Sequence, residues 1–379
     1  KTMQHPFDIA ADLDTPVSTY LKLRSLRPRF LLESVERGTH LARYSFLGFG
    51  EALEFRLDRD GIRYGDVSLP FPESQESLLD TLRAALTLTP KLYPEVEGLP
   101  FSGGFVGNAG YDIVRCFERL EHPPAGDVDS DTPLAAYLAT ESLLVFDHLT
   151  HRIALLHAGG EAERLELGEE VRRLLAGPLP ARPAKASYTP GAASLSKEEF
   201  MAAVIEAKQY IGLGDIYQIV LSVRFSGEHE LEPFQVYRAL RLLNPSPYMY
   251  FCDLDDLQIV GSSPEALVKL HNGNASLRPI AGTRPRGADK AEDQANETSL
   301  LADEKENAEH VMLVDLARND LGRVAEGGSV YVEPYRSIER YSHVMHIVSG
   351  VQGKVRSDKD AFDLFAATFP AGTLVGAPK

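Results

Sequence analysis

Residues 303–323 read DEKENAEHVMLVDLARNDLGR, an acidic opening that runs directly into an apolar stretch. The periodicity predicts a helix from about residue 292 to residue 320. On that helix Glu306 and Glu309 share a face, because they lie three residues apart, and His310 follows Glu306 by one turn. A helix that is apolar on nearly all sides is typically buried. Its first turns would then carry two carboxylates toward the interior.

The residues alone leave two interpretations of these carboxylates open. Buried acids need a cation or a proton, and two of them close together suit a hard divalent ion such as Mg²⁺. The commoner case is an exposed helix start, where acids complement the helix dipole and Glu306 pairs with His310.

Composition excludes several classes of protein. The chain has 379 residues, enough for two domains or one large composite domain, and a formal net charge of −16 without an obvious basic patch, which argues against nucleic-acid binding. Cys116 and Cys252 allow neither a disulfide framework nor a CxxC metal site. We see no signal peptide and no apolar run of about 18 residues, so we expect a cytoplasmic protein.

The chain is punctuated once by a segment rich in Pro, Ala, Gly and Ser, from about 176 to 196. This linker predicts an N-terminal region, 1–180, and a second region, 190–379. Ser196 and Glu199 form a candidate capping box for a helix that ends at Gly212 or Gly214. We expect strands at TYLKL (19–23) and IYQIVLSVRF (216–225). Helices and strands mix without βαβ alternation, which favours an α+β fold.

Several turns carry polar residues that chemistry could use. In PIAGTRPRG (279–287), Gly282 would let a ligand approach the backbone and Thr283 offers a hydroxyl. Glu265 follows a Ser-Ser-Pro turn, and Thr373 lies in a Gly/Pro-rich loop. Each has an ordinary structural alternative: a simple turn, or an acid at a helix start. SGGFVGNAG (102–110) lacks the GK[ST] ending of a phosphate loop and is better interpreted as a glycine-rich strand.

Together these segments resemble the chorismate-utilising enzyme family, and within it the branch that forms anthranilate. The resemblance extends in family order over 214–379 and is carried by GDIYQIVLS, NPSPYMYF, SSPEALVKL, PIAGTRPRG, DEKENAEHVMLVDLARNDLGR, IERYSHVMHIVSG and TFPAGTLVGAPK. LLESVE and RYSFLG carry it in the N-terminal half. It implies a large composite α+β fold, with mixed and antiparallel sheets packed as a β-sandwich flanked by helices.

The resemblance also implies a reaction. Chorismate gains an amino group at ring C2, loses its C4 hydroxyl and eliminates pyruvate, which gives anthranilate in the first committed step of tryptophan biosynthesis. The implied cofactor is Mg²⁺, held by Glu309, with Glu306 beside the ion or in its water shell. The other implied site residues are Gly282, Thr283 and Thr373 for binding chorismate, Glu265 as general acid for the departing hydroxyl, His346 near the ring, and Gln218.

Two positions separate branches of the family. Water-adding relatives carry a Lys where this chain has Gln218, and a neutral Gln favours ammonia as the nucleophile. Aminodeoxychorismate synthases carry a Lys where this chain has Ala281. Neither cysteine has the setting of a glutaminase nucleophile. The resemblance therefore implies a separate glutamine amidotransferase subunit, component II, in a heterotetramer. Aminodeoxychorismate synthase component I and a non-catalytic tryptophan-binding regulatory chain remain alternatives.

The N-terminal half carries a regulatory prediction. LLESVE matches a tryptophan feedback element through Glu33 and Ser34, and NPSPYM matches its other wall through Pro247, Tyr248 and Met249. The two segments lie on either side of the linker, so we expect bound tryptophan to bridge the halves and bias their orientation. The resemblance further implies residues beyond Lys379, among them a second Mg²⁺ carboxylate.

Overall fold

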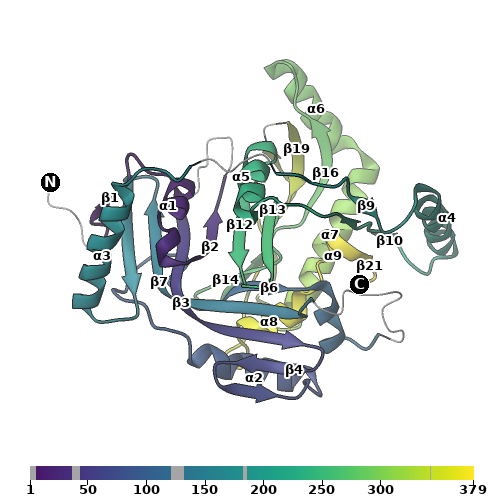
Figure 1. The fold of residues 1–379 in the computed structure, drawn as a ribbon. Helices are drawn as coiled ribbons and strands as arrows, with labels where there is room; N and C mark the ends of the chain where they lie inside the picture. Colours follow the sequence, from purple (N-terminus) through teal and green to yellow (C-terminus); the bar gives the residue numbers. More distant parts are fainter. Residues whose placement is uncertain (1–5, 36–42, 121–131, 182–185, 342) are drawn as a thin grey trace. The chain divides into compact units, whose positions relative to one another are not determined.

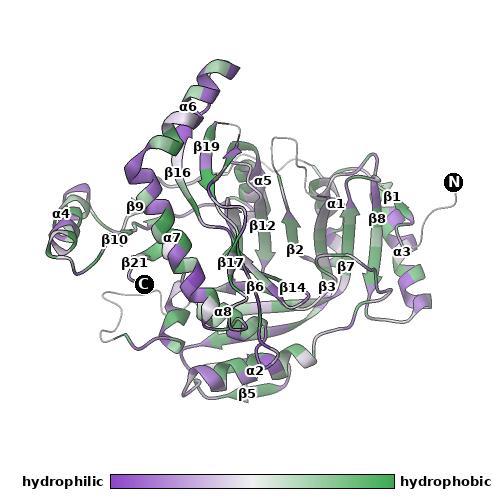
Figure 2. Ribbon diagram, turned by 180° about the vertical axis from the view of Figure 1, so that it is seen from behind, coloured by the Kyte–Doolittle hydropathy of each residue, from purple (hydrophilic) through white to green (hydrophobic). Residues whose placement is uncertain are grey.

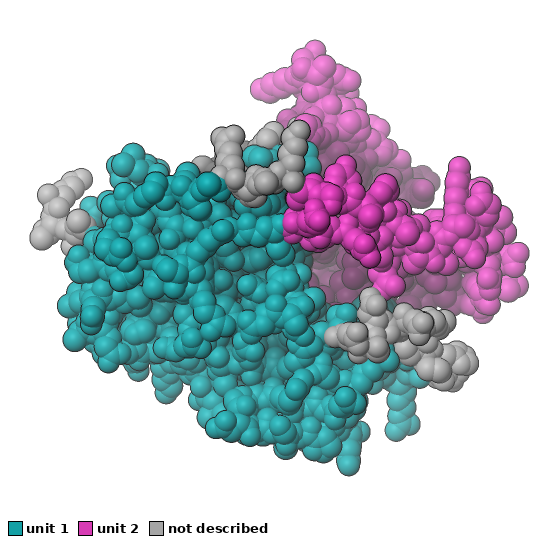
Figure 3. All heavy atoms as spheres, viewed as in Figure 1, with its two compact units in different colours: residues 1–184, 232–264 teal, residues 185–231, 265–379 magenta. Residues whose placement is uncertain are grey.

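The computed structural model describes residues 6–35, 43–120, 132–181, 186–341 and 343–379. It divides into two compact units (Figure 3), of which unit 1 comprises residues 1–184 and 232–264, and unit 2 comprises residues 185–231 and 265–379. The predicted linker coincides with the first crossing between them. The predicted boundary puts 232–264 in the second region, but this segment belongs to unit 1, because both of its strands join the unit 1 sheet.

Unit 1 is built on one large antiparallel sheet (Figure 1). Its main strand order is β1-β8-β7-β3-β2-β12-β13, with β4, β5 and β6 attached at the side. The strands are β1 (Ile9–Ala10), β2 (Pro28–Glu33), β3 (Tyr44–Asp58), β4 (Gly61–Tyr64), β5 (Val67–Leu69), β6 (Val106–Ala109), β7 (Ala135–Asp147), β8 (Arg152–His157), β12 (Tyr248–Asp253) and β13 (Gln258–Ser263). The predicted glycine-rich strand is β6, where a Cβ on Gly107 would lie 2.0 Å from the Ala136 carbonyl oxygen of β7.

The helices of unit 1 are α1 (Pro16–Lys22), α2 (Gln75–Thr87), α3 (Glu161–Leu175) and α5 (Pro233–Leu243), with short 3₁₀ turns at Arg24–Leu26 and Tyr111–Cys116. Buried residues of α1, α3 and α5 pack with strand residues in one core, and α3 turns a hydrophilic surface outward (Figure 2). The strand predicted at TYLKL is wrong. Thr15 caps a helix there by accepting from the Ser18 amide, and Pro16 suits its first turn.

Unit 2 contains smaller antiparallel sheets, with strand orders β14-β15-β20-β17 and β16-β19-β18, and the two-stranded pairs β10-β21 and β11-β9. Its strands are β9 (Ala192–Ala193), β10 (Gln218–Ile219), β11 (Phe225–Ser226), β14 (Lys269–His271), β15 (Asn274–Leu277), β16 (Ile280–Pro285), β17 (Tyr331–Val332), β18 (Ser337–Arg340), β19 (Val344–Val348), β20 (Val351–Lys354) and β21 (Gly376–Ala377). Its helices are α4 (Lys197–Leu213), α6 (Lys290–Ala302), α7 (Glu304–Gly322), α8 (Ala361–Thr368) and α9 (Gly372–Val375).

Two element predictions in unit 2 need correction. The long strand predicted over 216–225 is reduced to β10 and β11, because each pairs only with a two-residue strand in the described part of the chain. The helix predicted over 292–320 is two helices. Asp303 has extended backbone angles between them, and its carboxylate accepts from the amides of Lys305 and Glu306 as the N-cap of α7.

The predicted fold class and the predicted capping box are confirmed. The fold is α+β with antiparallel sheets. Ser196 and Glu199 form a capping box at the start of α4. Within the described residues, no helix is long and apolar enough to cross a membrane.

Candidate active site

Helix α7 organises the candidate site in unit 2. Leu313 and Ala317 on one face are buried, whereas Val311 on the opposite face is 47 % exposed. The predicted burial on nearly all sides is therefore wrong, because one face of α7 borders an open groove. Glu306 and Glu309 occupy its first two turns and are half-buried. The predicted Glu306–His310 pair is also absent from the described contacts: His310 instead contacts Ser349, Nε2 to Oγ 2.7 Å.

The Gly-Thr segment is a β-bulge inside β16 and not a turn after a strand. The register with β19 shifts between Ala281 and Thr283, which places Thr283 opposite His346. Gly282 has φ +76°, and a Cβ there would lie 3.3 Å from Glu306 Oε2. Glycine adopts that backbone freely, and an added Cβ would crowd the end of the Glu306 side chain as well as Leu300 and Ile347, each at 3.2 Å. The bulge thus brings Gly282, Thr283, His346 and Glu306 together.

The hydrogen bonds of His346 fix which ring nitrogen is available. Its Nδ1 lies 3.1 Å from the Gly282 carbonyl oxygen and 3.1 Å from Thr283 Oγ1. A carbonyl oxygen can only accept, so the hydrogen of the neutral ring is on Nδ1. Nε2 is then an acceptor able to take a proton from a substrate.

A hydrogen bond joins Gln218 and Glu309, which lie 91 residues apart in the sequence. The Gln218 amide donates from Nε2 to Glu309 Oε1 at 3.1 Å, and β10 holds Gln218 opposite Ala377 of β21. Both residues line the open groove of about 920 Å³ beside α7. The Gln218 amide therefore orients one oxygen of Glu309 without neutralising its charge.

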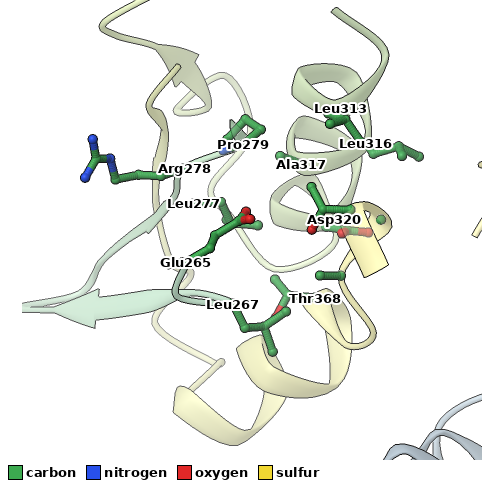
Figure 4. A pocket seen from close by; sticks show the side chains of 13 residues that line it. Glu265, Leu267, Leu277, Arg278, Pro279, Leu313, Leu316, Ala317, Asp320 and Thr368 are labelled. Atoms are coloured by element: carbon green, nitrogen blue, oxygen red, sulfur yellow. The ribbon is translucent and has the colours of Figure 1, made fainter. Parts of the chain in front are cut away.

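Glu265 faces a small cavity of about 30 Å³ further along α7 (Figure 4). Leu313, Leu316 and Ala317 of α7 form one wall, and Thr373 of α9 lies at another. Burial among these groups raises the pKa of Glu265 to about 7, although Arg278 acts in the opposite direction. A carboxyl group that holds its proton near neutral pH can serve as a general acid. The alternative of an acid at a helix start is wrong, because residues 265–268 are not helical.

An ion pair that the sequence did not indicate lies at another wall of this cavity. Asp320 is 5 % exposed and accepts from Lys379 Nζ at 2.7 Å, while Lys379 Nζ also donates to the Thr368 carbonyl oxygen at 2.8 Å. Lys379 lies two residues past the end of β21, so the pair anchors the segment after β21 to the last turn of α7. Both residues stand in the quoted motifs, but nothing local in either motif indicates that they meet.

The metal-ligand candidates on α7 are of the type that a hard divalent cation prefers, but they are fewer than such an ion binds. Glu306 and Glu309 supply carboxylate oxygens, which Mg²⁺ prefers. Among the described residues, no group of three or more His, Cys, Asp and Glu side chains is arranged to hold a metal. Arg284 Nη1 lies 3.8 Å from Glu306 Oε1, and Arg284 Nη2 donates to Asp303 Oδ2 at 2.8 Å, so Glu306 already has a cation nearby. Glu309, whose described partner is a neutral amide, fits the direct ligand better.

The predicted regulatory residues lie in unit 1 and not on two sides of a domain boundary. β2 pairs with β12, with Glu33 opposite Met249, and the Val35 amide donates to the Ser246 carbonyl oxygen at 3.0 Å. Ser34 and Tyr248 are half-buried nearby, and Pro247 directly precedes β12. The expectation that one ligand bridges two halves across the linker is therefore wrong. Glu36 of the LLESVE segment lies outside the described residues.

Glu33 is held by a network that the sequence did not suggest. Its side chain is 2 % exposed and accepts from Tyr237 Oη at 2.5 Å, Arg241 Nε at 2.9 Å and Arg241 Nη2 at 3.1 Å. Both donors belong to α5. The carboxylate is thus engaged by two side chains of α5, and Glu33 stays a predicted residue of the tryptophan feedback element.

The comparisons with known proteins agree with this geometry. The model of the family described as chorismate binding enzyme matches residues 27–379. Anthranilate synthase component 1 from Thermus thermophilus is 44 % identical over 374 residues, covering 97 % of this chain and 79 % of the relative. The Acetivibrio thermocellus protein of the same name is 41 % identical over 389 residues, covering 98 % of this chain and 78 % of the relative.

A solved structure gives the same result. Anthranilate synthase component I from Streptococcus pneumoniae superposes with a TM-score of 0.76 at 33 % identity, covering 98 % of this chain and 81 % of that one. The chain therefore belongs to the chorismate binding enzyme family. The resemblance to its anthranilate-forming branch is confirmed.

Proposed function

We propose that this chain converts chorismate and ammonia to anthranilate and pyruvate, as the chorismate-processing component of an anthranilate synthase. The observation that carries the proposal is Glu265, a carboxyl group with a pKa raised to about 7, in a cavity against the helix that bears Glu306 and Glu309. Loss of the C4 hydroxyl needs a proton donor, because hydroxide is a poor leaving group.

The proposed roles follow from chemistry within reach of each side chain. Gly282 and Thr283 bind a substrate carboxylate through the open backbone and the hydroxyl, and Thr373 contacts the substrate beside Glu265. Glu265 protonates the departing hydroxyl. His346, with Nε2 as acceptor, takes the ring proton as the ring becomes aromatic. Gln218 orients Glu309 and, being neutral, cannot activate water as a base.

Glu309 would hold Mg²⁺ directly, with Glu306 beside it. When bound, Mg²⁺ supplies positive charge that offsets the repulsion between an acidic site and a dianionic substrate. The Gln218 amide keeps one Glu309 oxygen oriented and leaves the other available. The bulge at Gly282 lets Glu306 approach the substrate-binding backbone.

The nitrogen source is proposed to be a partner subunit with glutaminase activity. Cys252 is buried and its pKa is raised to about 12, and burial also raises the pKa of the Cys116 thiol. Neither is primed as a nucleophile, since reactive cysteines have lowered pKa values. Ala281, 8 % exposed, offers no amine to attack the ring, which argues against aminodeoxychorismate synthase.

We propose that tryptophan inhibits this activity by binding unit 1 at the ends of β2 and β12. Ser34, Pro247 and Tyr248 border this region, with Met249 behind them. Glu33, held by Tyr237 and Arg241, fixes the end of β2 beside the proposed site. Tryptophan inhibits if it prefers a conformation that binds chorismate less well.

One assay tests the proposal. Purified full-length protein, supplied with chorismate, Mg²⁺ and ammonium, should produce anthranilate fluorescence. Glutamine should replace ammonium only when a glutaminase subunit is added. Formation of aminodeoxychorismate would favour that neighbouring enzyme, and tryptophan binding without turnover would favour the regulatory chain. Glutamine-dependent turnover by the chain alone would refute the two-subunit arrangement.

A further inference from the structure

Three buried polar atoms in unit 2 have no hydrogen-bond partner among the described residues, and the residues that carry them share contact partners. They are Asn307 Oδ1 and His310 Nδ1 on α7, and Arg336 Nε just before β18. Asn307 and His310 are three residues apart on α7 and therefore share a face. His310 is fully buried, with an exposed fraction of 0 %.

Two shared contacts join these residues. Asn307 Nδ2 donates to the Leu301 carbonyl oxygen at 2.8 Å, and Arg336 Nη2 donates to the same oxygen at 3.1 Å. His310 Nε2 lies 2.7 Å from Ser349 Oγ, which also accepts from the Arg336 backbone amide at 2.9 Å. Arg336 and Asn307 thus donate to the same Leu301 carbonyl oxygen, and Arg336 and His310 both contact Ser349 Oγ.

The chemistry of the three atoms selects their ligand. Asn307 Nδ2 donates to the carbonyl oxygens of Leu301 and Asp303, which fixes Oδ1 as an acceptor in need of a donor. Arg336 Nε–H is a donor in need of an acceptor, and His310 Nδ1 can play either part. An anion would be repelled by the Asn307 side-chain oxygen, and a metal cation would be repelled by the Arg336 guanidinium. Water satisfies all three, and a buried water typically makes about three hydrogen bonds.

We propose that Asn307, His310 and Arg336 bind one buried water, and that His310, through this water and Ser349, is a positioning residue for Glu306 and Glu309. The second part rests on the proposed function. Of the two α7 residues that bind the water, Asn307 directly follows Glu306 and His310 directly follows Glu309. Ser349 lies just past β19, which carries His346, and β18, which follows Arg336, pairs with β19. The network therefore fastens the carboxylate-bearing turns to the sheet that holds Thr283 and His346.

Two conservative variants separate the two bonds of His310. His310→Gln retains a polar group near the position of Nε2 and can keep the Ser349 contact. His310→Asn retains one near Nδ1 and can keep the water. His310→Leu removes both. We expect His310→Leu to raise the Kd of Mg²⁺, measured by calorimetry without chorismate, at least about 10-fold, which corresponds to about 1.4 kcal/mol. Each conservative variant should recover part of that loss.

A core variant distinguishes positioning from general destabilisation. Val355 is buried in the core of α7, α8, β15 and β20, away from the network. Val355→Ala should lower the unfolding midpoint and leave the Kd of Mg²⁺ unchanged. A His310→Leu chain that unfolds like wild type or like Val355→Ala, yet binds Mg²⁺ as tightly as wild type, would overturn the positioning role.

A high-resolution crystal structure of the wild-type chain tests the water separately. We expect density within hydrogen-bond distance of all three atoms. Side chains that pair directly with one another around an empty point would overturn the water. Wild-type protein that binds no Mg²⁺ would overturn the proposed metal site and the positioning role together. The presence of the buried water is decided by the electron density alone.

Discussion

Glu33 in unit 1 and the candidate-site residues Glu265 and Glu309 in unit 2 show two opposite ways of holding a partly or fully buried carboxylate. In unit 1, Glu33 receives three hydrogen bonds from Tyr237 and Arg241 and is almost fully covered. In unit 2, Glu265 faces a mostly apolar cavity and its pKa is raised to about 7, while Glu309 has a neutral amide as its described side-chain partner. A carboxylate with a full set of donors stabilises one geometry. A carboxylate buried in a mostly apolar cavity, or one whose described partner is a neutral amide, keeps its capacity for a proton or a metal ion.

The largest expected effect comes from removing an available carboxylate. Glu309→Gln preserves size and the Gln218 neighbour but removes the charge that would hold Mg²⁺. We expect turnover of chorismate to fall about 1000-fold, or about 4 kcal/mol, while circular dichroism and the unfolding midpoint remain near wild type. Glu304→Gln, an exposed acid on the same helix, is the matched control and should retain turnover within two-fold, on the order expected for a surface site. A Glu309→Gln enzyme within a few-fold of wild type would contradict the ligand role.

Changes to the hydrogen bonds of the Glu33 carboxylate should instead lower the free energy of unfolding. Arg241→Met leaves Glu33 buried with only the Tyr237 hydroxyl, and breaking a buried pair from one side costs about 3 kcal/mol or more. Urea unfolding should show this loss. Arg238→Met on the same helix removes an arginine that binds the neutral Gln235, and it should cost less than about 1 kcal/mol. Equal losses in the two variants would mean that Glu33 is not the reason α5 matters.

The pH dependence of stability sharpens the contrast at Glu265. Its folded pKa, about 7, exceeds the ordinary value of 4.5, so between these values the folded state holds a proton that the unfolded state has lost. Stability contributed by this group is therefore lost as pH rises from about 4.5 to about 7. Glu265→Gln should match wild type near pH 4.5 and exceed it by up to about 3 kcal/mol above pH 7. Chemical unfolding at several pH values measures the difference, and a difference independent of pH would refute the raised pKa.

The smallest expected effect concerns feedback. Ser34→Phe adds bulk beside Glu33 without touching the residues proposed for catalysis. We expect near-normal turnover and tryptophan inhibition weakened about 10-fold, or about 1.4 kcal/mol. Reciprocity also requires that chorismate weaken tryptophan binding to wild type by the factor with which tryptophan weakens chorismate binding. Full tryptophan sensitivity in Ser34→Phe would place the inhibitor elsewhere.

The sequence was most informative where a feature depends on neighbours along the chain. The capping box at Ser196 and Glu199 could be predicted, because both partners lie within one helical turn. The same knowledge of capping could have found α1 at Thr15 and the helix break at Asp303, since both are N-cap residue types. In both cases the apolar pattern alone favours the wrong element: a strand at 19–23, and one continuous helix over 292–320.

The sequence by itself determined which chemistry-bearing residues are present and which branch they resemble: neutral Gln218, Ala281 without an amine, and the acid and histidine motifs of the second half. Only the tertiary structure decided which of these meet. The register of β16 with β19 brings Thr283 to His346, and the β10-β21 pair brings Gln218 to Glu309. Tyr237 and Arg241 reach Glu33 across more than 200 residues because β12, which follows α5, pairs with β2. Helix caps and apolar periodicity depend on residues a few positions apart, so they can be predicted from a short segment. Strand register depends on which distant segments bury their apolar faces together.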